Sequence, residues 1–130
     1  MKLIKYASQN ISQEDIYSIK NTLKSEYLTQ GPKVREFENK LKKNFNVKYC
    51  VVTSSGTSAL KLSVQSLNLR KNACIIVPTN TFVATANAVI TNGYKILLAP
   101  INSKHGSLDY NCFLKTLNFA KNNKIKIDAL

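Results

Sequence analysis

The chain has 130 residues, 44% of them hydrophobic and 20% charged, a balance that is typical of a folded globular domain and excludes a disordered chain. No apolar run approaches the roughly 20 residues that a membrane-spanning helix needs, and the first residues lack the apolar core of a signal peptide. Three widely spaced cysteines fit neither a disulfide framework nor a metal site. We therefore expect a cytoplasmic protein with no membrane partner.

The formal net charge is +12. A strongly basic protein can bind nucleic acid, because its surface attracts phosphate backbones. Here seventeen lysines and two arginines are spread along the whole chain, and the densest groups, at 40–43 and 121–126, are interrupted by leucine, isoleucine or asparagine. Nucleic-acid modules gather arginine and aromatic residues on one face. The charge pattern therefore predicts no nucleic-acid partner.

The first 46 residues predict two helices separated by a turn. Ser12 precedes Asp15 by three residues, which is close to a capping box, and the helix that it starts is expected to end near Ser25. Gly31 and Pro32 end the irregular segment that follows, and Pro32 suits the first turn of a second helix. We expect Asn46 at the end of that helix, and a buried apolar stripe along it made of Val34, Phe37 and Leu41.

From Lys48 onward, apolar segments alternate with helical patterns. We expect strands at 49–53, 74–77 and 95–99, helices at 57–69, 82–91 and 110–120, and the start of a further strand at 126–130. Strands that alternate with helices pair in parallel, and helices then cover both faces of the sheet. The fold class is therefore α/β.

The segment from Val51 to Leu60 predicts a strand, a tight turn and the start of a helix. Its turn consists of small hydroxyl residues and Gly56, so an anion can approach the free backbone N–H groups of the helix start. Such a start binds phosphate through these amides and the positive end of the helix dipole. Many α/β proteins turn in this way for packing alone, so this motif by itself leaves both interpretations open.

Four segments together resemble the DegT/DnrJ/StrS sugar aminotransferases, which use pyridoxal phosphate (PLP) on the fold-type I scaffold. They match the family's N-terminal third in order and spacing, at residues 23–32 with 37–38, 54–60, 77–88 and 106–109. The leucine-threonine-glutamine-glycine form of the first segment is most similar to the pseudaminic-acid branch. The resemblance implies the N-terminal portion of the PLP-binding large domain, with 1–32 as a substrate and interface segment and 33–130 as a partial, truncated large domain.

The resemblance also implies a cofactor site. Residues matching Gly56, Thr57 and Ser58 surround the cofactor phosphate and the neighbouring substrate pocket, and an aromatic residue at the position of Phe82 stacks on the cofactor ring. We expect the amides of Thr57 and Ser58 and the Thr57 hydroxyl to be donors. The alternative interpretations are that Thr57 only caps its helix and that Phe82 only anchors the helix that follows it.

Substrate contacts are implied at Tyr6, at Gly56 and at the segment formed by Glu26, Tyr27, Leu28 and Thr29, near a dimer interface. Gly31 would allow close approach of a phosphate or sugar hydroxyl. Tyr6 could equally be an ordinary surface aromatic, and simple turn chemistry could equally explain Thr29 and Gly31. His105, in a polar segment, is assigned no catalytic role, and Asp109 is expected to cap the following helix.

The implied reaction moves an amino group from glutamate to C4 of a UDP-linked 4-keto-6-deoxy-N-acetylhexosamine, in a homodimer. It needs a lysine that bonds to the cofactor, and in the family this lysine lies downstream of the portion matched here. None of the seventeen lysines has a matching context, so we assign no catalytic residue and interpret the chain as truncated. A non-catalytic nucleotide-sugar-binding or assembly module is the alternative.

Overall fold

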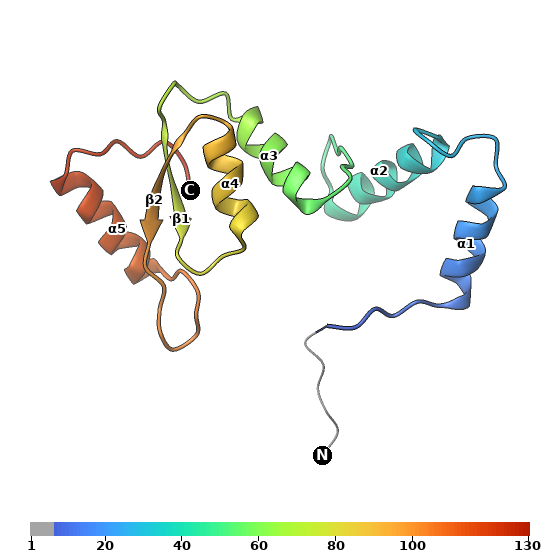
Figure 1. Cartoon of the computed structure of the whole chain (residues 1–130), viewed down its shortest axis with the longest axis horizontal. Helices are drawn as coiled ribbons and strands as arrows, with labels where there is room; N and C mark the ends of the chain where they lie inside the picture. Colours follow the sequence, from blue (N-terminus) through green and yellow to red (C-terminus); the bar gives the residue numbers. More distant parts are fainter. Residues whose placement is uncertain (1–6) are drawn as a thin grey trace, which may run out of the picture. The chain divides into compact units, whose positions relative to one another are not determined.

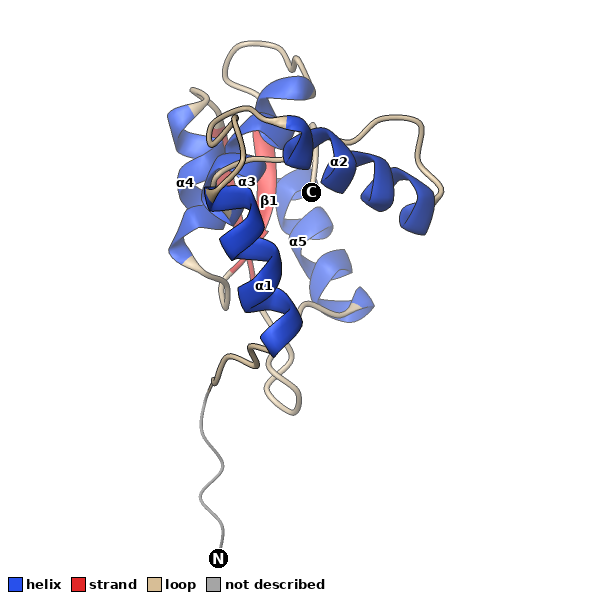
Figure 2. Ribbon diagram, turned by 90° about the vertical axis from the view of Figure 1, so that its right-hand side faces the viewer, coloured by secondary structure: helices blue, strands red, loops and turns tan. Residues whose placement is uncertain are grey.

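The computed structural model describes residues 7–130, which form two compact units divided between Val52 and Thr53. The chain folds as an α/β protein with a parallel sheet, as predicted (Figures 1 and 2). In chain order its elements are α1 (Gln13–Leu23), α2 (Pro32–Phe45), α3 (Gly56–Ser66), β1 (Cys74–Pro78), α4 (Val83–Thr91), β2 (Lys95–Ala99) and α5 (Tyr110–Asn122).

The helix ends of the first unit follow from local sequence. Ser12 and Asp15 form a complete capping box at the start of α1: the Asp15 N–H donates to Ser12 Oγ, and the Ser12 N–H donates to Asp15 Oδ2 at 2.8 Å. Pro32 opens α2, and Asn46 ends it in the left-handed conformation at φ 50°. These three predictions are confirmed.

Strands β1 and β2 form the sheet of the second unit. They pair in parallel, with Cys74 opposite Lys95 and Pro78 opposite Ala99. The chain crosses from one to the other through α4, and the turn after α4 uses Gly93 at φ +79°. Glycine suits this position because residues with a Cβ avoid positive φ. Chain reversal through a helix is what parallel pairing requires.

Helices cover both faces of these strands. On one face, Ile75 and Val77 of β1 pack with Val89 of α4 to form the buried core cluster. Strand side chains alternate between faces, so Leu97 of β2 points the other way, where it lines a hollow with Thr116 of α5. Figure 1 accordingly shows α4 and α5 on opposite sides of β1 and β2.

A third parallel segment lies on the other side of β1. Ala129 forms a bridge with Ile75, the Ile76 N–H donates to the Ala129 carbonyl at 3.0 Å, and the Asp128 N–H donates to the Cys74 carbonyl at 2.9 Å. The strand expected to start at 126–130 is thus present only as an isolated parallel bridge, so β1 has a hydrogen-bonded neighbour on each side.

The predicted strand at 49–53 is wrong for the described chain, where these residues form no strand. Tyr49 and Val51 are about three-quarters exposed, and the Val52 N–H donates to the Glu38 carboxylate at 3.0 Å. An extended segment becomes a strand only when a neighbour satisfies its backbone groups. Here a side chain takes that role for Val52.

The apolar stripe predicted along α2 is also not buried. No residue of α2 is buried, and Phe37 is 51% exposed. An amphipathic pattern buries its face only when another element packs on it. The expected division of the chain into a substrate and interface segment, 1–32, and a partial large domain, 33–130, refers to function and stays a prediction.

Candidate functional site

The start of α3 is set by Ser55. Its backbone is extended (φ −161°), and its Oγ accepts the Ser58 N–H at 3.2 Å, so Ser55 is the N-cap of the helix. The alternative in which Thr57 caps its helix is therefore excluded. The Ser58 amide, one of the predicted phosphate donors, is satisfied by this cap.

The backbone amides of Gly56 and Thr57, between the cap and Ser58, are free to bind a ligand. Neither the Gly56 N–H nor the Thr57 N–H has a hydrogen-bond partner among residues 7–130. A Cβ placed on Gly56 would meet no atom within 4 Å, and Gly56 and Thr57 are both exposed, so a ligand can approach the start of the helix. Because the first N–H groups of a helix carry its positive dipole end, the geometry fits an anionic group such as the phosphate of PLP.

Phe82 is the residue predicted to stack on the cofactor ring. It is the N-cap of α4 and is 73% exposed, so it is not a buried anchor for that helix. The preceding loop is held at both ends: the Thr79 N–H donates to the Ala99 carbonyl at 2.9 Å, and Thr81 Oγ1 donates to Thr85 Oγ1 at 3.0 Å. An exposed aromatic ring on a fixed loop can stack on a flat ligand.

The second unit contains both halves of the predicted cofactor site. Helices α3 and α4 pack on each other, and Asn92 at the end of α4 donates its side-chain amide to the Lys61 carbonyl of α3 at 3.1 Å. The same amide donates to the Ala88 carbonyl at 2.8 Å. This side chain therefore links the two helices whose first residues are the predicted ligands.

The predicted substrate segment belongs to the first unit. Glu26, Tyr27, Leu28 and Thr29 form an exposed irregular turn, and Tyr27 lines a hollow of about 290 Å³ with Gly31 and Arg35. Tyr6 lies outside the described residues. The structure gives these side chains an accessible position, and their role in substrate binding stays a prediction.

The structure shows a contact with Tyr27 that explains glycine at position 31 and that the sequence did not reveal. A Cβ at this position would lie 3.0 Å from both the Cβ and the backbone oxygen of Tyr27. The left-handed residue of the turn is Gln30, at φ +51°, rather than Gly31. The close contact that favours glycine is therefore one within the turn, between residues 27 and 31. It agrees with the alternative interpretation, in which Gly31 serves the turn.

Asp109 and His105 organise the loop before α5. Asp109 Oδ1 accepts the Cys112 N–H at 2.8 Å and caps α5 as predicted, while its Oδ2 accepts the Asn102 side-chain amide at 2.7 Å. These hydrogen bonds, that from Asn102 first, lower the pKa of Asp109 to about 2. His105 Nδ1 lies 2.7 Å from Ser107 Oγ in the same loop, and its Nε2 lies 4.0 Å from Asp109 Oδ2.

Nothing in residues 7–130 forms a metal centre, since no group of three or more His, Cys, Asp or Glu side chains gathers there. The apolar segments around Cys50 and Cys74 predict buried structural thiols at both positions. Cys74 is buried as predicted, whereas Cys50 is only half-buried. Cys112 is also buried, and desolvation raises the pKa of Cys74 and of Cys112. A raised pKa disfavours the thiolate, so neither buried cysteine is prepared to act as a nucleophile.

The parallel α/β unit, with free amides at the start of α3, agrees with the comparison with known protein families. A model of the DegT/DnrJ/EryC1/StrS aminotransferase family matches residues 9–116. The chain belongs to this family. The family resemblance drawn from the four sequence segments is confirmed.

Two curated relatives share one activity. A UDP-4-amino-4,6-dideoxy-N-acetyl-beta-L-altrosamine transaminase from Campylobacter jejuni is 40% identical over 107 residues, covering 82% of this chain and 28% of that protein. The Helicobacter pylori transaminase of the same name is 32% identical over 121 residues, covering 91% of this chain and 32% of that protein. The chain thus spans about 28 to 32% of these relatives' length.

Solved structures agree on the fold. A putative sugar aminotransferase from Streptococcus pneumoniae in its PLP form superposes with a TM-score of 0.77 at 26% identity, covering 87% of this chain and 29% of that one. The chain therefore has the fold of the corresponding part of a PLP-dependent aminotransferase, as predicted. No helix in residues 7–130 is both long and apolar enough to cross a membrane.

Proposed function

We propose that this chain is the N-terminal portion of a PLP-dependent aminotransferase that moves an amino group from glutamate to C4 of a UDP-4-keto-6-deoxy-N-acetylhexosamine. The observation that carries the cofactor part is the start of α3, where two exposed residues, Gly56 and Thr57, have backbone amides without a hydrogen-bond partner among residues 7–130. The 40% identity to a transaminase of this substrate class supports the choice of sugar.

In this proposal, PLP would supply the electron sink on which amino transfer depends. The chain's own contribution is binding and orientation. The N–H groups of Gly56 and Thr57 and the Thr57 hydroxyl donate to the phosphate oxygens, and charge-assisted bonds of this kind are stronger than neutral ones. Ser58 supports them indirectly, because its N–H and its hydroxyl, 3.1 Å from Ser55 Oγ, fix the cap of the helix.

Phe82 fixes the plane of the cofactor ring. Its exposed ring would form an offset stack that adds about 0.5–1.5 kcal/mol beyond burial. The loop that carries it is tied to β2 and to α4, so the backbone that bears the ring is held in place before the ligand arrives. Preorganisation of this kind lowers the entropy lost on binding.

The sugar nucleotide would contact Tyr6, Gly56 and the turn from Glu26 to Thr29. A homodimer completes the site in this proposal. The lysine that bonds to the cofactor would come from sequence beyond the part that corresponds to this chain, because the chain spans less than a third of its curated relatives.

The cofactor site can be tested by substitution of Thr57. We expect Thr57→Val, in the 130-residue chain joined to the coding sequence that follows it, to weaken PLP uptake about tenfold, the scale of one charge-assisted hydrogen bond. Uptake is measured from the visible absorbance of bound PLP after gel filtration. Thr91→Val is the matched control, because Thr91 is also exposed on a helix of the same unit and its hydroxyl donates to the Asn87 carbonyl.

Equal PLP uptake by both variants would contradict the phosphate role. Binding of a UDP-sugar that is unchanged by PLP would favour the alternative, a non-catalytic nucleotide-sugar-binding module. If the joined protein takes up no PLP, the proposed function fails as a whole.

A further inference from the structure

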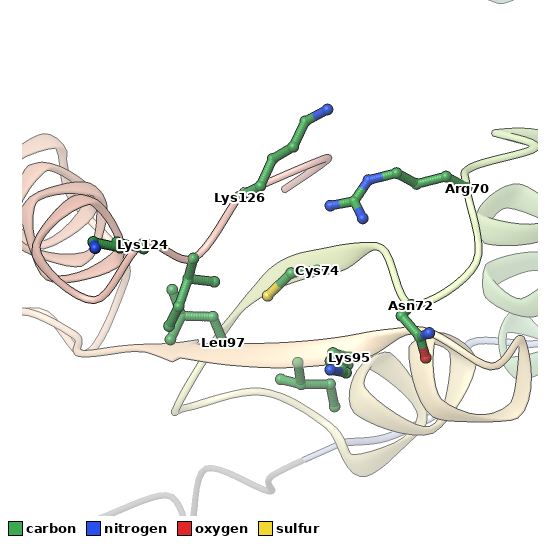
Figure 3. A pocket seen from close by; sticks show the side chains of 9 residues that line it. Arg70, Asn72, Cys74, Lys95, Leu97, Lys124 and Lys126 are labelled. Carbon is green, nitrogen blue, oxygen red and sulfur yellow. The ribbon is translucent and has the colours of Figure 1, made fainter.

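A basic hollow lies where the strands of the second unit begin (Figure 3). Cys74 and Lys95, the first residues of β1 and β2, lie opposite each other in the sheet and both line it. Its volume of about 620 Å³ falls within the range of small-ligand sites. Phe82 follows the other end of β1, so the basic hollow is separate from the candidate cofactor site.

The basic hollow carries more positive than negative charge. Four of its lining side chains are cationic and none is acidic: Arg70, Lys95, Lys124 and Lys126. Arg70 pairs with Asp128, whereas no carboxylate in residues 7–130 forms an ion pair with the three lysines. In Figure 3 the labelled side chains surround Cys74, with Arg70 and Asn72 on one side and the segment carrying Lys124 and Lys126 on the other.

Arg70 is held in position. Its Nε and Nη2 donate to the two oxygens of Asp128 at 2.9 and 3.0 Å, and Asp128 also accepts the Cys74 N–H at 2.9 Å. The Asp128 side chain is only 9% exposed, while that of Arg70 is 48% exposed. This bidentate pair fixes the plane of the guanidinium and leaves Nη1 free to donate to an anion.

Two residues that line the basic hollow have positive φ angles, and the conformation is unfavourable only for the lysine, since asparagine adopts it readily. Asn72 lies at φ +60° and Lys124 at φ +53°, in the left-handed region. Lys124 follows the C-cap of α5, a position where glycine is usual. The sequence therefore places a cation where local structure favours glycine, and residues held in such conformations gather at ligand sites.

We propose that the basic hollow binds an oligophosphate anion, either inorganic triphosphate or the phosphate chain of a nucleotide. Cations from three segments line the same hollow, and this excess of positive charge matches a compact ligand with several negative charges. The apolar residues Ile96, Leu97 and Ile125 form part of its wall and strengthen the attraction by lowering the local dielectric constant. A nucleic-acid strand would instead need basic and aromatic side chains along a continuous path.

The test uses isothermal titration of inorganic triphosphate into the 130-residue protein at about 0.15 M NaCl, where diffuse attraction is screened beyond about 8 Å. The test variant is Lys124→Gly with Lys126→Ala. The control variant is Lys42→Ala with Lys43→Ala, which removes the same charge from the last turn of α2 in the other unit. We expect the test variant to bind at least about tenfold more weakly and the control to stay within about twofold.

Thermal melting separates lost binding from lost folding. Glycine adopts the positive φ of residue 124 without the steric cost that a Cβ brings. The test variant should therefore melt no lower than wild type. A titration with ATP distinguishes the two sources of the phosphate chain. If ATP and triphosphate bind with equal affinity, the basic hollow recognises the phosphates alone. If ATP binds more tightly, the basic hollow recognises a nucleotide. Equal weakening in test and control variants, or no binding by wild type, would overturn the proposal.

Discussion

Gly31 occupies a position where the backbone leaves little room for a side chain. Replacing it by alanine would place a Cβ 3.0 Å from the Tyr27 backbone oxygen, which cannot move as a flexible side chain can. We expect Gly31→Ala to destabilise the turn before α2 by about 1 kcal/mol. Hydrogen exchange of the Val34 amide, which donates to the Gly31 carbonyl at 3.2 Å, measures this, because local opening of the turn exposes it.

Gly56→Ala is the control for this effect of size. A Cβ there meets nothing within 4 Å, and alanine favours the helix. Its exchange rates and melting temperature should therefore match those of wild type or show more protection. Equal loss of protection in both variants would mean that the crowding at Gly31 does not matter.

Asp109 gives the loop before α5 a defined pH dependence. Its folded-state pKa of about 2 lies below the ordinary value of 3.8, so its stabilising effect is complete above pH 3.8 and is lost as the pH falls toward 2. We expect Asp109→Asn to melt below wild type at neutral pH, and the gap to shrink as the pH falls through this window. Circular dichroism melts across the series measure this. A gap that stays constant with pH would contradict the role of the charge.

Residue roles were predictable from sequence where their partners are close in the chain. Ser12 and Asp109 both bond to amides three residues away, and such spacing is visible in a sequence. Ser55 was missed as a cap because four other hydroxyl residues, at 53, 54, 57 and 58, lie around it in the sequence. The role of Gly31 depends on a contact with Tyr27 that only the folded turn reveals.

Among the elements, the pairing of residues 128–129 with β1 depends on one ion pair. Asp128 joins Arg70 to the Cys74 N–H, and these bonds, that from Cys74 first, lower the pKa of Asp128. We expect Asp128→Asn to speed hydrogen exchange at the Ile76 N–H, which donates to the Ala129 carbonyl. Asparagine retains one acceptor oxygen but loses the charge and the bidentate geometry.

The Lys95 amide is the internal control for this experiment. It donates to the Ala73 carbonyl on the β2 side of β1, so its exchange should change little. Equal acceleration at both amides would indicate general unfolding instead of a loosened third segment.

The sequence placed β1 and β2 to within one residue, and it also predicted a strand at 49–53 that does not form. The ends of α1 and α2 are set by residues within one turn, whereas a strand exists only through a partner. The segment 49–53 has the composition of a strand, yet within residues 7–130 it pairs with none. The segment near Ala129 has a similar composition and does pair, because Asp128 holds it against β1.

At the scale of the whole molecule, sequence identified the family because four separated motifs stand in order, and the match over residues 9–116 confirms it. Burial was harder to foresee. The apolar residues of α2 predicted a core face, yet Phe37 remains half exposed. A hydrophobic pattern shows that a face suits burial, and it does not show which element covers it.

The excess of positive charge should make stability depend on salt. The sequence has nineteen lysines and arginines against seven acidic residues, and only Lys33–Glu36 and Arg70–Asp128 form lysine or arginine ion pairs within residues 7–130. Like charges repel in the compact state, and that repulsion is screened as the Debye length falls from about 30 Å at 0.01 M salt to about 8 Å at 0.15 M.

We therefore expect the thermal midpoint to rise with sodium chloride over this range. Differential scanning fluorimetry measures it, with glucose at matched osmolarity as the control for solvent effects. Replacing several isolated lysines by glutamine should flatten the dependence, because it lowers the net charge without touching the Arg70–Asp128 pair. A midpoint that falls as salt rises would mean that the few ion pairs outweigh the repulsion among the lysines.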